Sequence, residues 1–274
     1  MDFSGYVVQH EVAIRLGCFL GILGAMALWE LAAPRRTLTV PKLLRWINNM
    51  GMVVINSFLL RIVFPSAAVG VAVFAQKHGW GLFNYAQISH TVAIVMSVVA
   101  LDFIIYLQHV MFHAVPVFWR VHRMHHADLD FDVTTGVRFH PLEILLSMLI
   151  KSAGVVVLGP PVLGVIIFEV ALNATSMFNH SNVRVLHGVD RILRWFVVTP
   201  DMHRVHHSTE GRETNSNFGF NLPWWDRLLG TYRPQPRMGH EGMAIGLEEF
   251  RDRKSCVLLP GMLSIPFIGS FSKK

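Results

Sequence analysis

Eight of the fifteen histidines in this sequence lie in three short clusters whose spacing would bring their imidazoles together. Residues three and four apart share one face of a helix, so each cluster would direct two or three imidazoles at one point. Neutral imidazole is the commonest metal ligand and suits iron, zinc, copper and nickel. Eight imidazoles exceed what one ion with four to six ligands can use, which predicts two metal ions. An HxxxH and two HxxHH motifs supply them: His109, His113; His122, His125, His126; His203, His206, His207.

The composition places this histidine-rich site in or beside a membrane. The 274-residue chain is 52% hydrophobic and only 15% charged, with a mean hydropathy of +0.43, which is too apolar for an ordinary soluble domain. A net charge of +6 could suggest nucleic acid. In so apolar a chain, basic loops beside anionic lipid headgroups explain the charge better, and we expect no nucleic-acid partner.

Four apolar regions predict an all-α integral membrane protein with about four transmembrane or hairpin segments. The fourth region is too long for one crossing and contains Gly159-Pro160-Pro161, where we expect the chain to turn back as a hairpin. Lys151 within that hairpin must reach the interface or face a cavity lined by protein. The regions run from about 12 to 33, 49 to 75, 88 to 108 and 142 to 178.

Positive charge predicts how these segments are oriented. Arg35, Arg36, Lys42 and Arg45 crowd the loop after the first region, whereas the loop after the second holds only Lys77. The positive-inside rule puts the richer loops in the cytoplasm. With the hairpin in place, all three histidine clusters then form a helical cap on the cytoplasmic side.

Local signals predict the helices that carry two of the clusters. The HxxxH continues the third apolar region, so it would emerge where that helix leaves the membrane. Thr199, Pro200 and Asp201 form an N-cap, a proline at the first helical position and an acid in the first turn. Asp102 lies two turns before His109 on the same face and could orient a ligand histidine through a hydrogen bond.

The order of these motifs resembles the fatty acid hydroxylase/sterol desaturase superfamily of membrane histidine-rich di-iron oxidoreductases. The resemblance covers roughly residues 100 to 232. Some hydroxylases of the family carry an HxxxH around the lone histidine, but Arg184 stands four residues after it in this chain. The matching residues besides the three clusters are Asp102, Tyr106, Asn179-His180-Ser181-Asn182, Thr199-Pro200 and Trp225-Asp226 followed by Gly230-Thr231.

The resemblance implies the chemistry. Two non-haem irons would bind the eight clustered histidines and His180, and O2 would be used to hydroxylate or desaturate a C–H bond of a fatty acyl, sterol or ether lipid. His187 could replace the ligand missing at Arg184. His140 and Asp226 could bind metal themselves or could hydrogen-bond to a residue that does. The implied domains are transmembrane helices at 1–99, a catalytic domain at 100–232 that includes the hairpin at 142–178, and a tail at 233–274.

Electrons must come from outside the chain, and two other classes of function stay open. The sequence contains no dinucleotide-binding, P-loop, haem-attachment or iron–sulfur motif, so we expect a separate reductase, ferredoxin or cytochrome. A zinc-dependent membrane hydrolase or isomerase could use the same histidines, because ligand type alone does not separate zinc from iron. A membrane protein that merely binds metal or haem is the other alternative.

Overall fold

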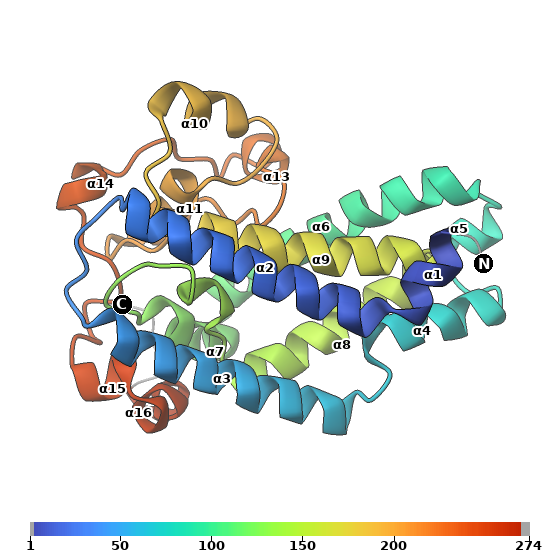
Figure 1. The fold of residues 1–274 in the computed structure, drawn as a ribbon, viewed down its shortest axis with the longest axis horizontal. Helices are drawn as coiled ribbons and strands as arrows, with labels where there is room; N and C mark the ends of the chain where they lie inside the picture. Colours follow the sequence, from blue (N-terminus) through green and yellow to red (C-terminus); the bar gives the residue numbers. More distant parts are fainter. Residues whose placement is uncertain (1–2, 270–274) are drawn as a thin grey trace.

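The chain folds as a bundle of long helices with a cap of short helices and loops at one end (Figure 1). A computed structural model describes residues 3–269, and it contains no β-strand within them. Five segments of this part are long and apolar enough to cross a membrane. They are α2 (Glu11–Ala32), the segment Lys42–Tyr85, α6 (His90–Ala114), α8 (Pro141–Leu158) and α9 (Val162–Asn179). The protein is therefore an all-α, multi-pass membrane protein, as predicted, whereas its cytoplasmic orientation stays a prediction.

The segment Lys42–Tyr85 is broken near Pro65, and shorter helices make up the rest of the chain. This break and a second one at 78–81 divide it into α3 (Lys42–Val63), α4 (Ala67–Lys77) and α5 (Leu82–Tyr85). Helix α1 (Phe3–Gln9) precedes α2 at the end of the bundle away from the cap (Figure 1). The cap consists of α7 (Pro116–His126), η1 (Thr135–Val137), α10 (His187–Leu193), α11 (Pro200–His206), α12 (Gly211–Thr214), α13 (Trp224–Leu228), α14 (Gly239–Gly242), α15 (Arg253–Val257), α16 (Leu259–Ser264) and η2 (Ile265–Phe267).

The predicted hairpin is confirmed as α8 and α9. Gly159 ends α8 in the left-handed conformation with φ of 64°, which glycine adopts without steric cost. A Cβ at Gly159 would also lie 2.3 Å from the carbonyl oxygen of Trp80, so the turn packs closely on the loop before α5. Pro160 and Pro161 then separate the two helices, and α9 returns to the cap (Figure 1).

Lys151 faces a protein-lined cavity, which was one of the two expectations for it. Its Nζ lies 2.7 Å from Oε1 of Glu169 on α9. Arg15 of α2 reaches Oε2 of the same carboxylate at 3.1 Å and pairs with Glu11 at 3.1 Å. Opposite charges thus neutralise one another inside the bundle, which is how charged side chains are tolerated at membrane depth.

The charges at the start of α3 differ from the sequence-based expectation. Lys42 and Arg45 lie in the first turn of α3, not in a loop, and the helix begins about seven residues before the predicted apolar region. Arg45 is fully buried, with Nη2 2.7 Å from Asp128 and a second ion pair to Asp132. The apolar pattern could not show this extension, because the polar turn is buried against acids far along the sequence.

The arrangement in Figure 1 predicts which exposed positions share a side of the membrane. In a Cys18→Ala, Cys256→Ala background, Thr37→Cys and Arg212→Cys should both react with an impermeant maleimide from one side of sealed vesicles. Lys77→Cys should react only from the other, because α3 separates it from the cap. Labelling of positions 37 and 212 from opposite sides would contradict the one-sided cap.

Candidate metal centre

Nine buried histidines meet where the cap joins the long helices. They form two groups, and within each group the candidate ligand nitrogens all lie within 4.8 Å of one another. The structure thus brings together all eight clustered histidines and His180. The five-histidine group is His109, His113, His122, His126 and His206, and the four-histidine group is His125, His180, His203 and His207.

Each HxxHH motif is divided between the two groups, which corrects the expectation that each would point at one spot. His122 and His126 belong to the five-histidine group, whereas His125 between them belongs to the other. Successive helical residues are rotated by about 100°, so the third and fourth positions after the first histidine point in clearly different directions. One helix can therefore serve two adjacent sites.

Local sequence signals position the elements that carry these histidines. Pro116 occupies the first turn of α7, so a new helix begins directly after α6 and places His122 and His126 beside His109 and His113. The Thr199 side chain caps α11 by accepting a hydrogen bond from the backbone N–H of Met202 at 3.4 Å, and Pro200 follows in the first turn, as predicted. His180 is the C-cap of α9, and there it meets the histidines of α7 and α11.

Backbone carbonyls determine which nitrogen of several rings is free. Nδ1 of His109 donates to the carbonyl of Phe218 at 2.7 Å, and Nδ1 of His206 donates to that of Ser216 at 2.7 Å. A carbonyl oxygen can only accept, so each of these Nδ1 atoms carries the hydrogen and each neutral ring keeps a lone pair on Nε2. The same holds in the four-histidine group: His125 donates to Arg138 and His180 to Ser176.

The free nitrogens face one another without a hydrogen between them, and this donor set fits metal ions. Nε2 of His125 and Nε2 of His180 are 3.2 Å apart, yet both carry lone pairs. Nε2 of His109 and Nε2 of His122 are also 3.2 Å apart, and Nδ1 of His122 is held by a carboxylate. Two acceptors at this distance repel each other unless a cation binds both, and imidazole nitrogen is a preferred ligand of transition metals.

Burial keeps these rings neutral, so the lone pairs are available. Burial lowers the pKa of His122 and of His180 to about 3, although the hydrogen bond from His180 to Ser176 opposes the shift. Burial, and then the neighbouring histidines, also hold the pKa of His126 and His207 well below the ordinary 6.5. At neutral pH protonation does not compete with a metal for these nitrogens.

Glu143 is a functional candidate that the sequence analysis missed. Its Oε1 accepts a hydrogen bond from Nδ1 of His122 at 2.6 Å, and both side chains are buried. A carboxylate in this position fixes the ring orientation of a ligand histidine and raises its basicity. The signal was an acid in the first helical turn directly after His140-Pro141, but only the fold shows that this turn faces His122.

Asp102 and Asp226 act on the site through a loop. Asp102 was expected to orient a ligand histidine, but its carboxylate accepts hydrogen bonds from the backbone of residues 221–222 and, at 2.8 Å, from the Trp225 indole. Asp226 accepts from the backbone N–H groups of residues 218 and 219 at 2.8 and 2.9 Å. The two carboxylates therefore fix the segment 216–222, whose carbonyls hold His109 and His206.

His140 and His187 lie outside both groups. His140 caps α8: its Nδ1 accepts from the backbone of Leu142 at 3.2 Å, and its Nε2 donates to the carbonyl of Leu263 at 3.3 Å. Both of its nitrogens are therefore occupied. His187 is exposed at the start of α10 and does not replace the ligand missing at Arg184.

Part of the sequence matches a known family. Residues 94–231, about half of the chain, match the family described as fatty acid hydroxylase. This stretch contains all nine histidines of the two groups. The same part of the sequence therefore carries both the family similarity and the candidate metal site.

Several characterised proteins are similar to the chain. It is 34% identical over 146 residues to the ornithine lipid hydroxylase OlsE of Rhizobium tropici, covering 53% of this chain and 43% of that protein. It is 26% identical over 168 residues to the alkylglycerol monooxygenase of Xenopus tropicalis, covering 60% of this chain and 36% of that protein. The chain thus spans less than half the length of these relatives. No solved structure matches it.

The contact between Glu143 and His122 predicts a measurable effect on metal affinity. Glu143→Ala should weaken metal binding roughly 10–100-fold, because His122 loses the carboxylate that orients it. Glu143→Gln should lose less, since its amide oxygen still accepts the hydrogen bond. Chelator competition after anaerobic loading with ferrous iron measures this, with the exposed Glu248→Ala as control. Equal affinity in Glu143→Ala and Glu248→Ala would refute the role of this contact.

Gly136 predicts an effect confined to the four-histidine group. A Cβ at Gly136 would lie 2.4 Å from the carbonyl oxygen of Ser176 and 3.2 Å from Nδ1 of His180, so Gly136→Ala must displace His180. Bound metal should fall from about two ions to about one per chain in elemental analysis. Gly211→Ala is the control, because nothing lies within 4 Å of its added Cβ. An undiminished metal content in Gly136→Ala would contradict this prediction.

Proposed function

The chain belongs to the fatty acid hydroxylase family, and from this premise we propose that it is a non-haem di-iron oxygenase of the membrane. It would hydroxylate, or desaturate, a C–H bond of a lipid with O2 and external electrons. One observation carries the proposal: two adjacent groups of neutral, buried histidines lie in the cap, and a cavity between the membrane-spanning helices reaches His109 and His122 of the five-histidine group.

The five-histidine group would hold one iron and the four-histidine group the other. The chemistry that such a pair supplies when bound is reductive activation of dioxygen, which allows attack on an unactivated C–H bond. The protein keeps the rings neutral by burial and directs their free nitrogens inward through carbonyls and Glu143. These contacts pre-organise the site, so little reorganisation is needed when metal binds.

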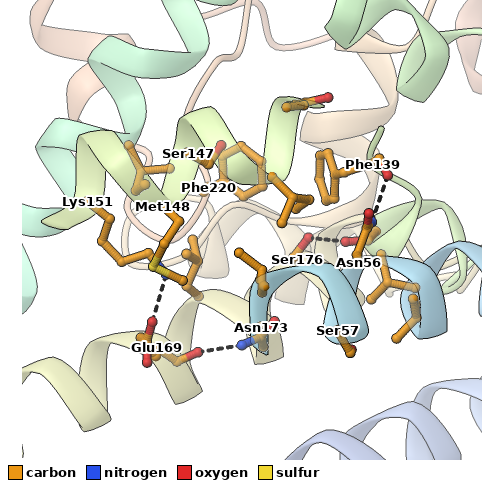
Figure 2. Close-up of a pocket in the computed structure, with 18 of the residues that line it drawn as sticks. Asn56, Ser57, Phe139, Ser147, Met148, Lys151, Glu169, Asn173, Ser176 and Phe220 are labelled. Carbon is orange, nitrogen blue, oxygen red and sulfur yellow. Dashed lines mark hydrogen bonds and ion pairs between the residues drawn. The ribbon is translucent and has the colours of Figure 1, made fainter. Parts of the chain in front are cut away.

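The cavity supports a lipid as the substrate. It has a volume of about 430 Å³, lies among α2, α3, α6, α8 and α9, and reaches His109 and His122. Figure 2 shows part of its lining, including Phe139 and Phe220 beside the polar Asn56 and Lys151. Apolar walls of this kind can hold one carbon of a chain against the histidines while they exclude bulk water.

The relatives support the same substrate class. One is named for an ornithine lipid and another for alkylglycerol, and both names describe lipids. We propose a fatty acyl, sterol or ether lipid as the substrate, and residues 100–232 as the catalytic unit between the N-terminal helices and the tail at 233–274. The cap would face the cytoplasm, where a reductase, ferredoxin or cytochrome can supply electrons.

Metal content and turnover test the proposal together. Anaerobically purified protein should hold about two irons per chain, and His125→Ala or His206→Ala should abolish O2-dependent product formation from membrane lipids, measured by mass spectrometry. His78→Ala is the control, since His78 is exposed at the end of α4. One tightly bound zinc with no O2-dependent turnover after iron loading would favour a zinc hydrolase or isomerase instead.

A further inference from the structure

The wall of the cavity carries hydrogen-bond acceptors that the protein leaves unused. Oδ1 of Asn56 on α3, Oε1 of Gln108 on α6 and Oε2 of Glu143 on α8 are each buried and lack a hydrogen-bond partner within residues 3–269. The side chains of Asn56 and Glu143 are only 7% and 3% exposed. Buried polar atoms are normally satisfied, so these three oxygens around one cavity are available to a donor that enters it.

The other polar atom of each of these three side chains already has a hydrogen-bond partner. Nδ2 of Asn56 donates to the carbonyl of Phe139 at 2.8 Å, a bond that Figure 2 marks, and that carbonyl can only accept. Nε2 of Gln108 donates to the Ser147 hydroxyl at 2.8 Å. Glu143 uses its other oxygen for His122. The acceptor-only carbonyl of Phe139 fixes the orientation of the Asn56 amide, and Oε1 of Gln108 is left for the cavity when its Nε2 donates to the Ser147 hydroxyl.

The three acceptors are linked to the histidines in different ways. Gln108 precedes His109 directly in α6, and Glu143 binds His122. Asn56 donates to the backbone carbonyl of Phe139, and the Phe139 ring stacks on His125 with ring centroids 4.5 Å apart. A group that donates to these oxygens would therefore occupy the same cavity that His109 and His122 line.

We propose that Asn56 and Gln108, together with Glu143, select lipids that carry O–H or N–H donors near the carbon that reacts. This inference rests on the proposed function and adds the class of substrate. A bare hydrocarbon tail or an ionised fatty acid offers no donor, so either would leave the three oxygens buried and unsatisfied. The polar end of the lipid, not the far end of its chain, then lies beside the histidines.

Binding of two matched lipids tests the proposal. Iron-loaded protein in lipid nanodiscs is kept anaerobic and without an electron donor, and unlabelled lipids displace radiolabelled hexadecylglycerol. Hexadecylglycerol has two hydroxyl donors, whereas its dimethyl ether has none and keeps the same chain. We expect the wild type to prefer hexadecylglycerol roughly tenfold or more, since an unsatisfied buried acceptor is costly.

Variants then assign the preference to the named side chains. Asn56→Leu and Gln108→Leu should each reduce the preference severalfold to roughly tenfold, whereas Gln108→Glu, which keeps an acceptor oxygen, should retain it. Gln76→Leu, exposed on α4, is the control for an added leucine. Because the two acceptors are removed in separate variants, the test remains valid if one variant fails to give a monodisperse peak on size exclusion.

The outcomes separate this inference from the proposed function. Equal affinity of the wild type for both lipids, or full preference in both leucine variants, would overturn the inference even if lipids are hydroxylated. Preference without O2-dependent turnover would overturn the oxygenase proposal and leave the donor selection standing, because the binding assay needs neither O2 nor electrons.

Discussion

The facing lone pairs of buried, neutral imidazoles are the constraint on which the rest of the structure depends. Nε2 of His125 and Nε2 of His180 lie 3.2 Å apart with no hydrogen between them, and this arrangement is stable only around a cation. The protein must therefore hold these rings against their mutual repulsion before a metal binds. It does so with rigid backbone acceptors, because a carbonyl in a fixed loop determines both the tautomer and the direction of the ring.

A hierarchy of buried carboxylates keeps those acceptors in place. Asp102 and Asp226 hold the segment 216–222, which in turn holds His109 and His206. Asp128 and Asp132 bind Arg45 and tie the loop after α7 to the first turn of α3. Asp128, Asp132 and Arg45 are buried and paired, so removal of one partner would leave an uncompensated charge in the interior. The strength of the cap thus comes from paired polar groups as much as from its apolar core.

The membrane-spanning helices connect the cap to the lipid phase. Histidines lie at the cap ends of α6 and α9, and the cavity between the helices reaches His109 and His122 of the candidate metal site. Deeper in the bundle, Lys151, Glu169 and Arg15 form a paired group on the wall of the same cavity. Polar groups inside an apolar bundle are costly and commonly functional, and in this cavity Gln108 and Glu143 lie on the wall together with His109 and His122.

The sequence alone determined the features that follow from local periodicity. The spacing of the histidines, the cap at Thr199-Pro200 and the break after Gly159 all depend on neighbours within one or two helical turns, and the structure contains each of them. Tertiary structure alone decided the division of each HxxHH between two groups, the partner of His122 and the burial of Arg45. These features join residues 21 to 109 positions apart, such as Glu143 to His122 and Phe218 to His109. No local pattern encodes such pairs, because they arise only when helices with separate local preferences pack around one buried site.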